Sequence, residues 1–284
     1  MALVSVIVPA HNASAYLEEA LLSVLSQRPA PAPGAVEICL HDDASTDATP
    51  LLVARLLATP SAFAAGGAVR LKTSRRAPEL GPQGVGSARN RAVEMAEGEV
   101  LVFLDADDVM LEGRVEEMRR LCLEHPDAIV GSDFEREPRD ATPRYTEYHR
   151  SLNNSNLLAF AFRDAPMAMP TLACHRRVFD RVGGFKEGRG IPEDLHFIYA
   201  HLLLGGALHK TPSVLVRYRH HPAMTSLTLS RRTLLLVRVA AFEALVLPAW
   251  ADRAARARGA GDGALSPPAS WSAPPSSAPP SFAP

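Results

Sequence analysis

Residues 100–108 read VLVFLDADD, five apolar residues followed at once by a cluster of carboxylates. An unbroken apolar run of this length predicts a strand buried on both faces of a parallel sheet. Such a strand carries Asp105, Asp107 and Asp108 to its carboxyl end, where open α/β sheets bind their ligands. Because neighbouring carboxylates repel and are costly to bury, the cluster predicts a bound cation. Oxygen ligands suit Mg²⁺ or Mn²⁺, ions that commonly hold a diphosphate.

Strands and helices alternate outward from this stretch over about the first 130 residues. Apolar runs predict strands over residues 3–9, 36–40, 69–72, 100–104 and 128–130. Apolar positions at helical spacing predict helices over residues 17–27, 45–56, 87–97 and 115–123. The expected N-caps are Asn12 or Ser14 for the first helix, and Ser45 or Thr46 for the second. The alternation predicts an α/β fold with a doubly wound, mostly parallel sheet.

The alternation loosens after Pro138, where a polar stretch rich in Arg, Tyr and Asn begins. We expect residues 1–135 to bind the donor ligand and 136–250 to form an acceptor side. In the second part the sequence predicts helices over 193–204 and 231–247 and a strand over 214–218. Residues 251–284 are rich in Pro, Ser and Ala, and are predicted to be a disordered tail because they cannot offset their ordering entropy.

Composition excludes several classes of protein. The 30 Lys and Arg balance 31 Asp and Glu, so no broad positive field is available to bind nucleic acid. Cys39, Cys122 and Cys174 lack metal-ligand spacing and are predicted to be reduced, buried thiols. The N-terminus lacks a basic leader, and no apolar run of about 18 residues suggests a transmembrane segment. We therefore expect a soluble, cytoplasmic protein.

Three further groups of polar residues have two interpretations each. Asp42 and Asp43 close the second strand, where they could form a turn or accept a hydrogen bond from a uracil N–H. Glu193-Asp194 could be the acidic start of a helix or could supply a general base. His220-His221 after Arg219 could be surface residues, or a metal ligand beside an arginine that binds a diphosphate.

One glycine-rich stretch invites a different hypothesis. Gly84-Val85-Gly86 precedes a helix, as in a dinucleotide-binding loop. However, Arg89 and Asn90 stand where the third glycine is required, and no apolar strand comes directly before the loop. The sequence therefore argues against an NAD site.

The motifs, taken in order, resemble the family 2 inverting glycosyltransferases of the GT-A fold over residues 3 to about 226. They are VSVIVPAHN (4–12), LEEALLSVLSQ (17–27), HDDASTD (41–47), GVGSARNRAVEMAEGEVLVFLDADD (84–108), VGGF (182–185), PED (192–194) and YRHHP (218–222). Within that family, LDADDVM, RYT, GIPEDL and YRHHP are most similar to β-1,3-N-acetylglucosaminyltransferase-like members. The resemblance implies a metal-dependent transfer of a sugar, with UDP-N-acetylglucosamine as the expected donor and a glycan or glycoconjugate as acceptor.

The same resemblance implies roles for individual residues. Those expected to bind the nucleotide sugar are Pro9, His11, Asp42, Asp43, Arg89, Asp105 and Arg219. Within this set Pro9, His11 and Asp43 would line the uracil pocket, and Asp105 would contact the nucleoside sugar. Asp107 and His221 would hold Mn²⁺ or Mg²⁺, and Asp194 would be the catalytic base.

Two positions depart from the family pattern. His11 replaces a common Tyr, and Thr171-Leu172 lack the aromatic residue often found before the acceptor site. A protein that binds the donor without turnover is therefore an alternative. A sugar-phosphate nucleotidylyltransferase is another, but it requires a glycine-rich basic loop where residues 9–16 read PAHNASAY.

Overall fold

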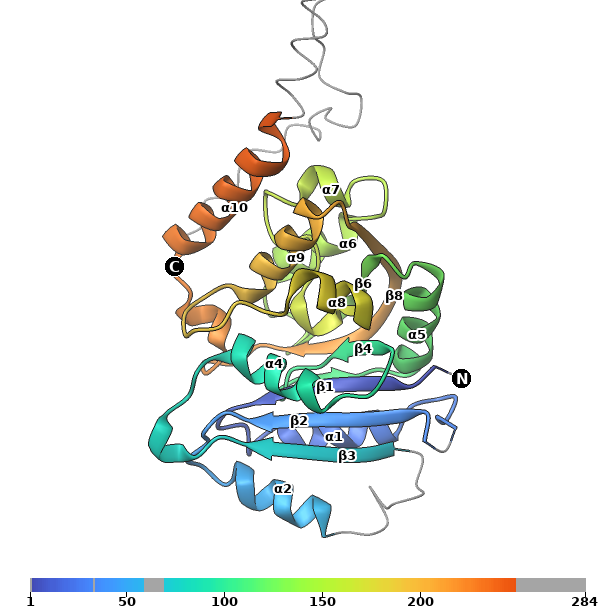
Figure 1. The fold of residues 1–284 in the computed structure, drawn as a ribbon, viewed down its shortest axis with the longest axis vertical. Coiled ribbons are helices and arrows are strands. Elements are labelled where there is room, and N and C mark those ends of the chain that lie inside the picture. Colours follow the sequence, from blue (N-terminus) through green and yellow to red (C-terminus); the bar gives the residue numbers. More distant parts are fainter. Residues whose placement is uncertain (1, 33, 59–68, 249–284) are drawn as a thin grey trace, which may run out of the picture.

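A computed structural model describes residues 2–32, 34–58 and 69–248, and the predicted tail at 251–284 lies outside them. One mixed sheet organises this part of the chain, in the order β3-β2-β1-β4-β7-β6-β8-β5 (Figure 1). Its strands are β1 (Val4–Ala10), β2 (Val36–Asp42), β3 (Val69–Arg75), β4 (Val100–Phe103), β5 (Val109–Met110), β6 (Ala128–Glu137), β7 (Ala173–His175) and β8 (Ala207–Arg219). Strands β3, β2, β1 and β4 run parallel, as the sequence predicts.

Helices cover both faces of the parallel part. The α-helices of the described residues are α1 (Leu17–Leu25), α2 (Thr49–Leu57), α4 (Val85–Met95), α5 (Arg114–Glu124), α6 (Pro143–Ser151), α7 (Leu157–Phe160), α8 (Arg176–Val182), α9 (Glu193–Leu203) and α10 (Arg231–Leu245). Successive side chains of a strand point to opposite faces, so Val6 and Val8 pack with α1 while Ile7 packs with α4. This two-sided burial explains the nearly continuous apolar run of β1, and the layered arrangement confirms the α/β fold class.

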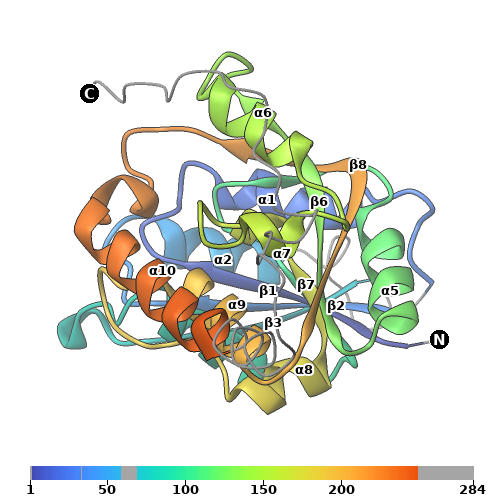
Figure 2. The ribbon, with the colours of Figure 1, turned by 90° about the horizontal axis from the view of Figure 1, so that it is seen from above.

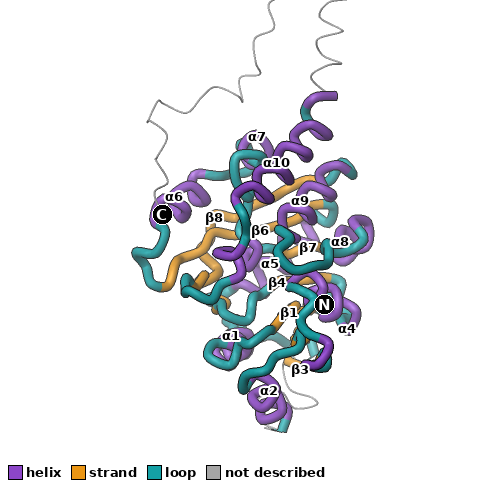
Figure 3. The backbone as a smooth tube through the Cα atoms, turned by 90° about the vertical axis from the view of Figure 1, so that its left-hand side faces the viewer, coloured by secondary structure: helices purple, strands orange, loops and turns teal. Residues whose placement is uncertain are grey.

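The two ends of the sheet carry different layers. Figure 3 shows β1, β3, α1 and α2 towards one end, and β6, β8, α6 and α7 towards the other. From above, α10 lies alongside α9 (Figure 2), and the two helices are in contact. The second half of the chain is therefore built around β6 and β8, which pair in parallel.

Strand β7 was not predicted. It spans three residues and pairs antiparallel with both β4 and β6, which makes the sheet mixed. Three residues are too few to show a period of two, so the sequence gives no signal for it. Strands β6 and β8 are also longer than predicted, because their ends carry charged residues and β6 is irregular between Gly131 and Phe134.

The predicted helix caps are wrong. Helix α1 begins after Tyr16 and α2 after Ala48, and neither has a side-chain cap. The polar residues in question join two loops instead. The Asn12 side-chain oxygen accepts the Thr46 N–H at 2.9 Å, and the Ser45 hydroxyl accepts the Asn12 N–H at 2.8 Å. These bonds tie the end of β1 to the end of β2.

Two predictions about the rest of the described chain can be compared directly. Cys39, Cys122 and Cys174 are buried and unpaired, as expected for reduced thiols. Among the described helices, none combines the length and the hydropathy needed to cross a membrane.

The buried imidazole of His149 in α6 makes stability depend on pH. It packs against Phe134 and Tyr145, and its Nε2 has no hydrogen-bond partner. Burial, aided by the charges of Lys210 and Arg136, lowers its pKa to about 3. Below pH 6.5 the unfolded chain therefore binds a proton that the folded chain does not. The free energy of unfolding consequently decreases as the pH is lowered.

We expect His149→Phe to reduce this pH dependence. Between pH 6.5 and 5 the wild type should lose about 2 kcal/mol more of its free energy of unfolding than the variant does. Urea denaturation at the two pH values measures the difference. Equal losses in both proteins would show that His149 is not the group responsible.

Candidate active site

Several of the predicted site residues lie at the carboxyl ends of the parallel strands. Strand β1 leads into His11, β2 into Asp43, and β4 into the segment that begins with Leu104-Asp105. Pro9 is buried in β1, beside His41 of β2 in the parallel register. Parallel strands place these ends along one edge of the sheet, where a ligand can contact several of them.

The acidic cluster has the chemistry of a cation site. Oxygen atoms of Asp105, Asp107 and Asp108 all lie within 4.8 Å of one another. Burial and the charges of its neighbours raise the pKa of Asp107, and the same causes raise the pKa of Asp108 further. The Asp108 Oδ2 atom is buried without a hydrogen-bond partner. A divalent cation would relieve the repulsion among the three carboxylates and would give the unpartnered oxygen of Asp108 a partner.

The loop after β8 brings a histidine to this cluster. His221 Nε2 lies 3.0 Å from Asp107 Oδ2, although 114 residues separate them in the chain. The imidazole stacks on the Tyr16 ring, with 4.7 Å between ring centroids. Asp107 and His221, the two residues expected to hold the metal, are therefore neighbours in the folded protein.

Arg219 lies beside the same cluster and is held by protein groups. Its Nη1 donates to the Asp107 carbonyl oxygen at 3.1 Å, and its backbone N–H donates to Asp108 Oδ1 at 2.8 Å. The guanidinium also pairs with Glu19, and with Glu137 at 3.1 Å. Arg219 thus carries a positive charge next to the acidic cluster, and is oriented by two carboxylates.

The two aspartates at the end of β2 support local structure. The Asp43 carboxylate accepts the N–H groups of Gln83, at 2.9 and 3.0 Å, and Gly84, at 2.8 Å. The imidazole of His11 donates to the Asp43 carbonyl oxygen at 2.7 Å. Asp42 accepts the Ser45 N–H at 3.0 Å and pairs with Arg75. These contacts fit the turn interpretation, and a contact with uracil stays a prediction.

Asp194 lies in the first turn of α9. Its carboxylate accepts the N–H of Leu195 at 2.7 Å. Burial raises its pKa, and so does the negative charge of Asp105, whereas the Leu195 N–H and the charge of Arg89 lower it. A carboxylate with a raised pKa is a stronger base than a free one, which suits proton abstraction.

Helix α4 contributes a fully buried arginine, Arg89, that connects the acidic cluster to the first turn of α9. The Arg89 side chain is 2% exposed, and its Nη2 donates to Asp105 Oδ1 at 2.6 Å. Its Nη1 donates to the Glu193 carboxylate, and the guanidinium lies over the Phe185 ring. Burial raises the pKa of Glu193 to about 7, although Arg89 opposes that rise. The role of Glu193 beside Asp194 was not predicted from the sequence.

A second buried arginine, Arg114 of α5, was also missed. Its Nη2 donates to the carbonyl oxygens of Phe103 and Pro170. Burial lowers its pKa to about 9, against the opposing charges of Asp108 and Asp105. Arg114 therefore provides positive charge close to the acidic cluster. An arginine at the start of a helix is typical of a surface position, so this role could not be predicted.

Close packing of α4 against the 184–193 loop depends on glycines. A Cβ at Gly86 would overlap the Lys186 carbonyl oxygen and approach the Glu193 Cβ at 3.2 Å. At Gly84, φ is +104°, and a Cβ would lie 2.5 Å from the Gly188 carbonyl oxygen. The glycines that resemble a dinucleotide-binding loop are therefore needed for packing against the loop that precedes Asp194.

We expect Gly86→Ala to destabilise the protein by about 1–3 kcal/mol, because the backbone at Lys186 must move to admit the methyl group. Urea denaturation measures this change. Arg91→Ala is the control on the same helix, since Arg91 is exposed and should change stability by less than about 0.5 kcal/mol. A Gly86→Ala protein as stable as Arg91→Ala would contradict the packing argument.

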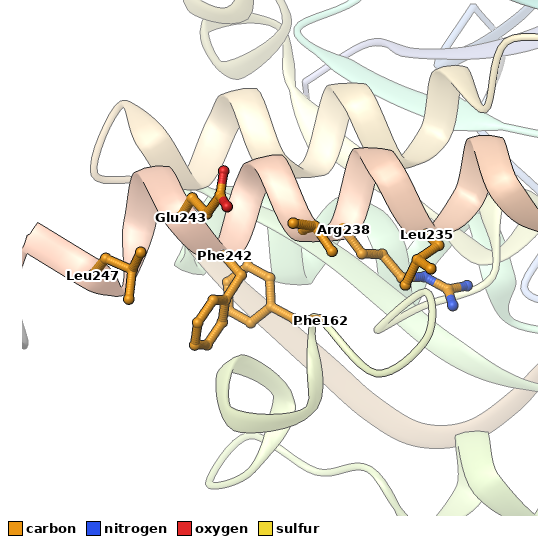
Figure 4. Close-up of a pocket in the computed structure, with 7 residues that line it drawn as sticks. Phe162, Leu235, Arg238, Phe242, Glu243 and Leu247 are labelled. Atoms are coloured by element: carbon orange, nitrogen blue, oxygen red, sulfur yellow. The ribbon is translucent and has the colours of Figure 1, made fainter.

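An apolar hollow of about 320 Å³ lies elsewhere, between α10 and the loop after α7. In Figure 4, Phe162 reaches from that loop towards Phe242 of α10, and Leu235 and Leu247 lie at the two ends of the hollow. None of the predicted site residues lines it. The hollow is therefore separate from the candidate active site.

The model of the family named Glycosyl transferase family 2 matches residues 5–183. An uncharacterized glycosyltransferase of Haemophilus influenzae is 30% identical over 125 residues, which is 44% of each chain. The chain thus spans about half the length of the curated relatives it matches.

Solved structures share the fold. S. aureus TarS 1-349 in complex with UDP-GlcNAc aligns with 86% of this chain and 68% of its own, with a TM-score of 0.68 at 19% identity. The Pyrobaculum calidifontis mannosyltransferase PcManGT, in complex with GDP-Man and Mn²⁺, aligns with 91% of this chain and 76% of its own, with a TM-score of 0.58 at 21% identity. At these identities the likeness supports the predicted GT-A architecture and nothing finer.

Proposed function

Because the chain belongs to glycosyltransferase family 2, we propose that it moves N-acetylglucosamine from UDP-GlcNAc to a hydroxyl of a glycan or glycoconjugate. The observation that carries this proposal is the cluster of Asp105, Asp107 and Asp108 with His221 beside it, and with Asp194 near enough for the charge of Asp105 to raise its pKa.

The donor would lie along the carboxyl ends of the parallel strands. Its uracil would contact the loops after β1 and β2, where Pro9, His11, Asp42 and Asp43 lie. Asp105 follows β4 and would contact the nucleoside sugar. Arg219, next to Asp107, would place its positive charge near the diphosphate.

Mn²⁺ or Mg²⁺ would be held by Asp107 and His221. Their side chains already lie 3.0 Å apart, and the unpartnered oxygen of Asp108 adds negative charge at the same place. When bound, the ion supplies positive charge that stabilises the departing diphosphate. The protein's part is to orient the carboxylates and the imidazole that bind it.

Asp194 would act as the general base in a single displacement. It takes the proton of the acceptor hydroxyl while that oxygen forms a bond to the anomeric carbon of the sugar. On the opposite side the bond from that carbon to the diphosphate oxygen breaks, and its electron pair leaves with UDP. Configuration inverts in one step, so no protein nucleophile is needed, and Glu193 is free for another role.

The choice of donor rests on likeness. TarS is described in complex with UDP-GlcNAc and PcManGT with GDP-Man and Mn²⁺, so the fold accommodates both kinds of nucleotide. The stretches LDADDVM, RYT, GIPEDL and YRHHP favour the UDP-GlcNAc assignment. A protein that binds the donor without turnover is the second candidate, because Thr171-Leu172 lack an aromatic residue at the acceptor side.

Release of nucleotide diphosphate tests the proposal. The full chain is incubated with Mn²⁺ and, separately, UDP-GlcNAc, UDP-glucose, UDP-galactose or GDP-mannose. Release should be fastest from UDP-GlcNAc. Faster release from another donor would overturn the assignment of the sugar, and binding of UDP without release from any donor would favour the binding protein.

A further inference from the structure

Both terminal nitrogens of Arg89 are already bonded to carboxylates of the protein, and the side chain is buried. Nη2 is bonded to Asp105 and Nη1 to Glu193, while the whole side chain is 2% exposed. The remaining nitrogen, Nε, is buried without a partner. The ring of Phe185 lies 5.5 Å from the guanidinium carbon. All of its strong contacts are therefore with groups of the protein.

The two carboxylates that it joins lie on different elements. Asp105 follows β4 in the part of the chain expected to bind the donor, and Glu193 begins α9 immediately before Asp194. One guanidinium with two donor nitrogens in a fixed fork sets the distance between its two partners. The position of Asp194 relative to Asp105 thus depends in part on this side chain.

The neighbouring residue strengthens the same connection. The Asn90 amide donates to the carbonyl oxygen of Phe185 at 2.9 Å, and its oxygen accepts the Phe185 N–H at 2.9 Å. Together with the close approach at Gly86, these bonds hold α4 against the loop that leads to α9. Helix α4 is therefore fixed to the base-bearing segment at several points.

We propose that Arg89 is a positioning residue, which fixes Asp194 relative to the donor site by bridging Asp105 and Glu193. This inference rests on the proposed function, in which Asp194 is the base. It gives Arg89 a role through other residues instead of the direct contact with the nucleotide sugar that the family resemblance implies. Glu193 is its partner in that role.

Three variants test the bridge. Arg89→Met removes both bonds, Arg89→Lys keeps the charge without the fork, and Glu193→Gln keeps an acceptor without the charge. Arg91→Met is the matched control, because Arg91 lies two residues further on α4 and pairs with Glu94 at the surface. The kinetic readouts are kcat and KM for UDP-GlcNAc with Mn²⁺. Hydrogen exchange of the amides in 185–194 is the readout that needs no turnover.

We expect Arg89→Met to lower kcat by about a hundredfold while KM for UDP-GlcNAc stays within about threefold. Arg89→Lys and Glu193→Gln should each lower kcat less, and should give a folded protein if Arg89→Met does not. Amides in 185–194 should exchange faster in all three variants than in Arg91→Met.

Two results would overturn the inference. A rise in KM of more than about tenfold, with kcat and exchange unchanged, would show that Arg89 contacts the donor directly. Unchanged kcat in all three variants would show that the bridge does not position the base. If the wild type releases UDP from none of the donors, the proposed function fails. Hydrogen exchange is then the only test of whether Arg89 bridges Asp105 and Glu193. Faster exchange in 185–194 would then support it, and unchanged exchange would refute it.

Discussion

Asp194→Asn is expected to lower turnover of UDP-GlcNAc by about 10²- to 10⁴-fold, the usual contribution of a general base. The amide keeps the size of the side chain and can still accept the Leu195 N–H, so the first turn of α9 is preserved. Only the capacity to take a proton is lost. The affinity for UDP, measured by calorimetry with Mn²⁺, should therefore stay within about threefold of the wild type.

Asp180→Asn is the matched control, because Asp180 is an exposed carboxylate in α8. It should leave both turnover and UDP affinity unchanged. Turnover that survives in Asp194→Asn would remove Asp194 from the mechanism. A loss of UDP affinity equal to the loss of turnover would assign the residue to donor binding.

Asp107→Asn is expected to weaken the apparent affinity for Mn²⁺ by at least about tenfold, which is about 1.4 kcal/mol. An amide is a weaker ligand than a carboxylate, and His221 loses the charged neighbour that now lies 3.0 Å away. The measurement is the rate of UDP release as a function of Mn²⁺ concentration. At saturating Mn²⁺ the variant should recover part of its rate.

Glu112→Gln serves as the control, since Glu112 is an exposed acid five residues further along the chain. Its dependence on Mn²⁺ should match that of the wild type. If Asp107→Asn also matches the wild type, the ion is not held by this carboxylate. If every divalent ion tested at the same concentration restores the rate of Asp107→Asn equally, the site does not select among ions.

The parallel part of the fold could be predicted because its signals are local. Strands β1 and β4 are buried on both faces, so β4 is an unbroken apolar run and β1 is interrupted only by Ser5. The carboxylates of Asp105, Asp107 and Asp108 follow β4. Helix α4 likewise shows its apolar face at helical spacing. In these elements the spacing of apolar residues follows from which positions are buried, so the elements can be predicted from the sequence.

What could not be predicted depends on contacts between distant residues. Asn12 and Ser45 are residue types that often cap helices. Here they instead hydrogen-bond between the loops after β1 and β2, and this contact depends on how the two strands pair. Arg89 was expected to bind the nucleotide sugar, whereas folding surrounds it with Asp105 and Glu193, of which Glu193 is 104 residues away. Buried charge pairs of this kind leave no periodic signal.

The most direct test of the account is a calorimetric titration of the full chain with UDP, in the presence and absence of Mn²⁺. The acidic cluster, His221 and Arg219 together predict binding that requires Mn²⁺, because without the ion the diphosphate would approach neighbouring carboxylates. Binding of UDP only when Mn²⁺ is present is the predicted result. Absence of UDP binding to the folded protein under both conditions would contradict a metal-dependent UDP-sugar site.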